Sequence, residues 1–152
     1  MKNDPLAFPR EQDTPPAAFR RLPAGLVLLA LTLLMFGDVL FFNTGQVLSG
    51  AGLDLFSGEL SGCDFLFRQL RTGAAALWNP YIFCGTPNLS TPFYPPLWGF
   101  LFFGLPLAAN ITIALHVFLI GFFMYLWAEF RGLHPLACLA AAITVMFCGP
   151  FF

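Results

Sequence analysis

Charged residues are scarce in this chain. Only 10% of its 152 residues are Asp, Glu, Lys or Arg, and the formal net charge is -1. There is no basic patch of the kind that binds a nucleic acid. A glycine-rich phosphate loop and a Ser/His/Asp arrangement are also missing, and the spacing of Cys63 and Cys84 matches no metal-binding motif. We therefore expect no nucleic-acid partner and no metal site built on cysteine.

Apolar residues are abundant instead. They make up 58% of the chain, against roughly 45 to 50% in soluble domains, and the mean hydropathy is +0.76. They are also gathered into long runs separated by short polar segments. This composition predicts an all-α integral membrane protein.

The first apolar run, 24–42, is long enough to cross about 30 Å of hydrocarbon as a helix. Pro23 suits its first turn, and Asp38 is its only charged residue. Because a charge at mid-bilayer costs about 2.5 to 3.5 kcal/mol, Asp38 is expected to reach the interface or to face other helices.

Two further runs predict transmembrane helices at 106–130 and 135–152. Helix 106–130 is expected to be closed by Tyr125 and Trp127 as interfacial aromatics. Segment 97–104 is too short to cross and predicts an interfacial or re-entrant helix. Because the last run reaches the end of the sequence without a polar flank, we expect the chain to be the N-terminal part of a longer protein.

The distribution of positive charge predicts the orientation. Basic residues precede the first run, and Arg131 lies in the turn between the last two. The positive-inside rule places the tail 1–23 and that turn in the cytoplasm. The loop 43–96 is then extracytoplasmic, which makes it a large first external loop.

Within this loop, Ser61 followed by Asp64 suggests a helix N-cap, and Gly73 suggests a stop. We expect a short helix at 62–72, on which Asp64 and Arg68 can pair. The segment LWNPYIFCGTP at 77–87 is the part of the loop best suited to a site, since it combines Trp, Tyr and Asn with turn-forming Gly and Pro.

Several residues allow two interpretations. Asp54 is either a solvated loop carboxylate or a catalytic one. Cys63 and Cys84 can form an external disulfide or remain thiols. His116, inside the second long run, is a functional candidate or a neutral histidine bonded to a neighbouring helix, and His134 suits a turn before Pro135.

The order of motifs resembles the N-terminal region of the bacterial YfhO-like membrane proteins, which belong with the GT-C-type glycosyltransferases. The resemblance starts near Leu26 and covers most of the chain. Its motifs are Asp54-Leu55, an LR-x-G step, LWNPYIFCGTP, a YPP turn, an LH…MYLW helix and RGLHP. One departure is that only NLSTPF separates GTP from YPP, where family members carry a longer stretch.

The resemblance implies a multi-pass GT-C-like fold in the bacterial cytoplasmic membrane. Its activity would be transfer of a sugar from a polyprenyl-phosphate carrier to a cell-envelope acceptor. Asp54 matches the catalytic base of the first external loop, with no cofactor required and a divalent cation possible. Arg68 or Arg71 suits the donor phosphate, although both also suit lipid head groups.

Trp78, Asn79 and Tyr81 suit stacking on a sugar or hydrogen bonding to it. The alternative is that their segment is a structural plug packed at the membrane surface. For the chain as a whole, the alternative to an enzyme is a non-catalytic multi-pass membrane protein, an assembly partner or transporter fragment, that uses the loop for binding.

Overall fold

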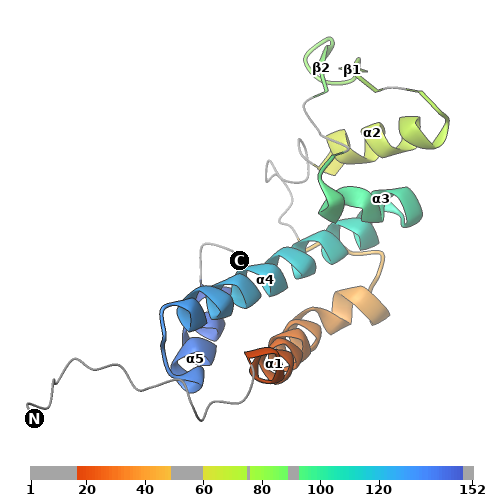
Figure 1. Cartoon of the computed structure of the whole chain (residues 1–152). Helices are drawn as coiled ribbons and strands as arrows, with labels where there is room; N and C mark the ends of the chain where they lie inside the picture. The colour runs from red at the N-terminus through yellow and green to blue at the C-terminus, as the bar shows by residue number, and fades with distance from the viewer. Residues whose placement is uncertain (1–16, 49–59, 75, 89–92, 149–152) are drawn as a thin grey trace, which may run out of the picture.

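The chain is mostly helical in the residues that its computed structural model describes, which are 17–48, 60–74, 76–88 and 93–148. Figure 1 shows two long helices, with α5 packed near one end of α4 and α2, α3 and a small hairpin gathered at the other. In chain order the elements are α1 (Ala17–Gly37), the π-helix η2 (Asp38–Phe42), α2 (Ser61–Arg71), β1 (Trp78–Asn79), β2 (Thr86–Pro87), the 3₁₀ helix η4 (Pro95–Trp98), α3 (Gly99–Phe102), α4 (Leu105–Phe130) and α5 (Pro135–Met146).

Two helical segments are long and apolar enough to cross a membrane. They are Arg21–Phe42, which joins most of α1 to η2, and Leu105–Phe130, which is α4. Within an apolar 18-residue stretch of each segment, only 22% of the first and 33% of the second are buried against the described chain. Since a core helix of a soluble protein is mostly buried, most of their apolar surface calls for another apolar environment.

The first helix begins earlier than the sequence predicted. Helical structure starts at Ala17, so Pro23 lies inside α1 rather than in its first turn, and the expected tail 1–23 is partly helical. A proline near a helix start removes one hydrogen bond, and the alanines, arginines and leucine before it favour helix. Asp38 is exposed, and its Oδ1 accepts a hydrogen bond from Asn43 Nδ2 at 2.7 Å.

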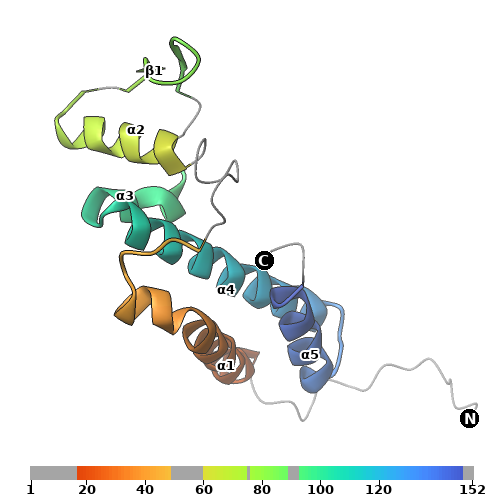
Figure 2. The same ribbon diagram turned by 180° about the vertical axis from the view of Figure 1, so that it is seen from behind.

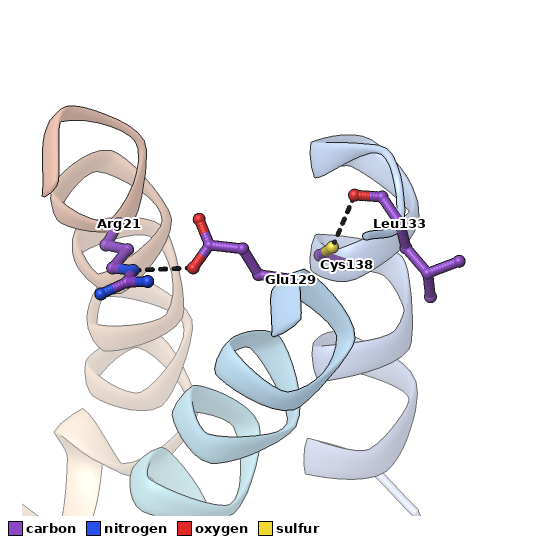
Figure 3. Close-up of polar contacts among 4 residues, drawn as sticks. All are labelled: Arg21, Glu129, Leu133 and Cys138. Atoms are coloured by element: carbon purple, nitrogen blue, oxygen red, sulfur yellow. Dashed lines mark hydrogen bonds and ion pairs between the residues drawn. The ribbon is translucent and has the colours of Figure 1, made fainter. Parts of the chain in front are cut away.

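Helices α1 and α4 run antiparallel. At one end, Arg21 Nε donates to Glu129 Oε2 at 2.7 Å (Figure 3). At the other end, Val39 of η2 lies beside the start of α4, where its carbonyl accepts a hydrogen bond from Asn110 Nδ2. Between these ends, small and apolar side chains form a common core with α5.

The turn from α4 to α5 is a Schellman motif. Gly132, at φ +77°, donates to Glu129 O, and Leu133 donates to Ala128 O. His134 caps α5 by accepting from Leu136 N, which confirms it as a turn residue. Figure 3 also shows the Cys138 thiol directed at the Leu133 carbonyl.

Helix α5 is shorter than the predicted span 135–152, because it ends at Met146. Its 12 residues rise about 18 Å, which is less than the thickness of a hydrocarbon core of about 30 Å.

The aromatic residues near the end of α4 do not share one role. Trp127 is exposed, and the Arg131 guanidinium carbon lies 5.9 Å from its ring centroid. Tyr125, by contrast, is 2% exposed. The prediction that Tyr125 is an interfacial residue is therefore wrong, because its side of α4 faces the core shared with α1 and α5.

At the other end of α4, helix α2 packs over α3 in a second apolar cluster. Helix α2 confirms the predicted short helix and its stop, since Gly73 at φ +79° closes a second Schellman motif. The N-cap position belongs to Leu60, so the prediction of a Ser61 cap is wrong.

The expected helix at 97–104 is split into η4 and α3, with Pro95 and Pro96 opening the 3₁₀ turn. Helix α3 and the start of α4 pack with α2 in the second apolar cluster, which consists of Leu60, Cys63, Leu66, Phe67, Ala76, Phe100, Ala108 and Ala109.

Candidate functional site

The predicted site residues that the structure describes lie at one end of the molecule. Arg68 and Arg71 are on α2, Trp78 and Asn79 form β1, and Tyr81 follows in the turn (Figure 2). Asp54, the predicted catalytic base, lies outside the described residues. The structure therefore brings five of the six predicted residues to this end.

The segment 77–88 is a β-hairpin, an element that the all-α prediction did not include. Strand β1 pairs antiparallel with β2, so that Trp78 faces Pro87 and Asn79 faces Thr86. Asn88 N donates to Leu77 O at 2.9 Å, which extends the pairing by one step. The strands have two residues each, too few for a sequence pattern of period two to reveal.

The turn of the hairpin has an unusual backbone. Phe83 and Cys84 have φ angles of 49° and 60°, and Gly85 has a φ of +116°. Positive φ is unfavourable for residues with a Cβ. This conformation places Phe83 at the surface with 90% of its side chain exposed and turns Gly85 against the Trp78 indole.

The three predicted sugar-contacting residues have different surroundings. Asn79 is buried, and its Oδ1 accepts a hydrogen bond from Tyr81 N at 3.0 Å, so it holds the turn in place. Trp78 and Tyr81 are exposed, and the Tyr81 ring meets Phe65 edge-on with 5.8 Å between centroids. Of these three residues, Trp78 and Tyr81 leave aromatic surface exposed to a ligand.

The two arginines of α2 also differ. Arg68 Nε contacts Asp64 Oδ2 at 2.7 Å, as the i,i+4 spacing predicted, and its side chain is 69% exposed. Arg71 Nη2 donates to the carbonyl oxygens of Phe100 and Phe103, the latter at 3.2 Å. Arg71 thus satisfies carbonyl groups at the C-terminal end of α3. Arg68 is the arginine better placed to bind an anion.

Asn110 is a site-forming residue that the sequence analysis missed. It is fully buried on α4. Its Oδ1 accepts from Leu48 N at 3.1 Å, and its Nδ2 donates to Gln46 O at 2.7 Å. A lone amide within an apolar run was the available signal, because a buried amide needs partners.

A second polar cluster holds the YPP turn against α4. His116 Nδ1 lies 2.6 Å from Thr112 O, and its Nε2 lies 2.5 Å from the Tyr94 hydroxyl. Since a carbonyl only accepts, Nδ1 carries the proton and Nε2 accepts from Tyr94. His116 is thus bonded within its own helix and to the preceding segment, rather than to a neighbouring helix as predicted.

The remaining candidates have simple surroundings. Cys63 is buried in the second apolar cluster and Cys84 is exposed in the hairpin turn, and both are thiols. Among the described residues, no group of three or more His, Cys, Asp or Glu side chains is arranged to hold a metal ion. In the described part of this end, the exposed groups available to a ligand include aromatic side chains, Arg68, Arg71 and the Cys84 thiol.

No protein-family model matches the chain, and no curated protein or solved structure shows significant similarity to it. The resemblance to the YfhO-like proteins therefore stays a prediction that depends on the motifs in the sequence.

Proposed function

We propose that this chain belongs to a GT-C-type membrane glycosyltransferase of the YfhO-like kind, which transfers a sugar from a polyprenyl-phosphate donor to a cell-envelope acceptor. The observation that carries the proposal is the common location of Trp78, Tyr81 and Arg68 at one end of two apolar helices. Aromatic faces bind sugar rings, and a guanidinium suits phosphate oxygens. A lipid-linked sugar phosphate presents both chemistries at a membrane surface.

The proposed orientation follows the charges. Arg21 and Arg131 lie at the end where α1 begins and α4 ends. The positive-inside rule assigns this end to the cytoplasm of a bacterial cell. The hairpin and α2 then face the outside of the cytoplasmic membrane, where lipid-linked donors and envelope acceptors meet.

Asp54 is the proposed base. The chain on both sides of it is held at the hairpin end, since Leu48 N is bonded to Asn110 and Leu60 is buried in the second apolar cluster. Asp54 itself lies outside the described residues, and as an ionised carboxylate it would accept the proton of the acceptor hydroxyl. The hydroxyl oxygen bonds to the anomeric carbon as the bond from that carbon to the phosphate oxygen breaks, and the carrier phosphate leaves with the electron pair.

The test is sugar transfer in membranes that contain the protein, with labelled polyprenyl-phosphate sugars as donors. Asp54→Asn should abolish transfer at an unchanged protein level. Asp38→Asn is the matched control, because Asp38 is an exposed carboxylate near the same membrane surface that no step uses. Full activity of Asp54→Asn would disprove the base assignment.

The second candidate is a non-catalytic membrane protein that uses this end for binding. It is favoured by Asn79 and Arg71, because both predicted substrate residues are engaged in holding the fold. If the parent protein binds donor lipids or an envelope component but transfers no sugar from any donor tested, this candidate replaces the enzyme.

A further inference from the structure

The hairpin 77–88 exposes large apolar side chains at a position where no described residue covers them. Phe83 is 90% exposed and Tyr81 is 81% exposed, and Leu77 and Trp78 are exposed beside them. Burying one such side chain is worth about 1.5 to 3 kcal/mol. If the hairpin faced water, it would lose this free energy at each of the exposed side chains. Its exposed side is therefore expected to contact another apolar surface.

The charge pattern distinguishes between possible covering partners. No Asp, Glu, Lys or Arg occurs between Arg71 and Glu129, so the hairpin itself carries no charged side chain, and the charges beside it are those of Asp64, Arg68 and Arg71 on α2. Basic side chains beside an aromatic surface suit the phosphate groups of lipid heads. A surface that combines Trp, Tyr and Phe without charges is typical of the boundary between lipid head groups and acyl chains.

The backbone of the hairpin also suits a poorly hydrated environment. The two strands pair with each other, Asn88 N donates to Leu77 O, and Gly85 N donates to Ile82 O. Pro80 and Pro87 have no N–H to satisfy. Much of the hairpin's hydrogen bonding is therefore internal, which lowers the cost of leaving water.

The length of α4 agrees with such a boundary at the end of the molecule that carries the hairpin. Helix α4 has 26 residues and rises about 39 Å, somewhat more than a hydrocarbon core of about 30 Å. Exposed aromatics mark both of its ends, with Trp127 and Phe130 at one and Phe102 of α3 at the other. Phe41 and Phe42 of η2 are exposed near the same end as α3, where Asn110 joins η2 to α4.

From these observations we infer that the hairpin is a lipid anchor. Phe83 enters the outer part of the acyl chains, and Trp78 and Tyr81 lie at head-group depth in the leaflet on the hairpin side. This anchoring does not depend on sugar transfer. It would hold the end of the molecule that carries Arg68 at the level where a lipid phosphate lies.

The experiment measures the depth of Trp78 in a bilayer. The protein carrying Trp98→Phe and Trp127→Phe retains Trp78 as its sole tryptophan. It is reconstituted into phosphatidylcholine and phosphatidylglycerol vesicles whose acyl chains are brominated near the head group or near the tail. Trp78 emission should be largely quenched by the shallow bromine, less by the deep bromine, and little by aqueous iodide.

Two other results would overturn the inference. Strong iodide quenching without an effect of bromine would place the hairpin in water, and insensitivity to both quenchers would place it against protein.

A second variant removes the anchor: Phe83→Asp in the same background should raise iodide quenching and shift the emission to the red. Thr44→Asp, an exposed position outside the hairpin, should leave both unchanged. Because no sugar is involved, failure here is separate from failure of the enzyme proposal.

Discussion

Gly85 lies directly against the indole ring of Trp78. A Cβ built on Gly85 would come within 2.7 Å of Trp78 Cζ2 and 2.8 Å of Trp78 Nε1. The φ of +116° at Gly85 is a second constraint, because side-chain-bearing residues rarely adopt it. The two residues therefore depend on each other: Trp78 can cover the hairpin turn only because position 85 has no side chain.

Gly85→Ala should open the hairpin. Combined steric overlap and backbone strain cost about 1 to 3 kcal/mol, so the variant should show faster proteolysis within 77–88 and a shifted Trp78 emission. Gly45→Ala is the matched control, because a Cβ there meets no atom within 4 Å and its φ is not positive. Equal proteolysis of the two variants would contradict the packing described.

Asn110→Leu should loosen the junction between η2 and α4. The substitution removes the hydrogen bonds of Asn110 to Leu48 N, Gln46 O and the buried Val39 O, and each lost bond costs about 0.5 to 1.5 kcal/mol. Thermal unfolding in detergent should show a clear loss of stability. Thr144→Val is the comparison, since the Thr144 hydroxyl bonds only to Ala140 O of its own helix and should matter little. A stable Asn110→Leu protein would show that these bonds do not hold the loop entry.

Arg21 and Glu129 should show a small but measurable coupling. Because the Arg21 side chain is 50% exposed, a coupling of about 0.5 kcal/mol is expected. A double-mutant cycle with Arg21→Gln and Glu129→Gln measures it by unfolding in detergent. The exchanged pair, Arg21→Glu with Glu129→Arg, should recover stability relative to either reversal alone. If both reversals behave independently, the contact does not orient α1 on α4.

The two histidines should be in opposite tautomers. His116 donates from Nδ1 to Thr112 O, whereas His134 accepts at Nδ1 from Leu136 N. Imidazole ¹⁵N shifts at a pH where both rings are neutral should show the proton on Nδ1 of His116 and on Nε2 of His134. Tyr94→Phe should move the Nε2 signal of His116 and leave His134 unchanged. The same tautomer at both positions would refute the hydrogen bonds assigned here.

Local patterns predicted α4, α2 and one ion pair. Helix α4 follows from a long uninterrupted apolar run, and α2 ends where Gly73 supplies a left-handed residue. The ion pair of Asp64 with Arg68 follows from helical spacing alone. These features depend on neighbours within a few residues, and such neighbours are readable in the sequence. Helix α1 starts before Pro23 because the residues ahead of it are helix formers and a proline near a helix start removes one hydrogen bond.

The apolar, charge-poor character of the chain, its two long helices and its aromatic segment 77–87 are all readable in the order of the residues. Only the tertiary structure decided how individual side chains are used. It buried Tyr125 and Asn79, committed Arg71 to the carbonyls of α3, and made Asn110 the link between α4 and the chain after η2. The physical reason is that each of these roles depends on partners distant in the sequence, and residue type alone does not specify which partner folding brings near.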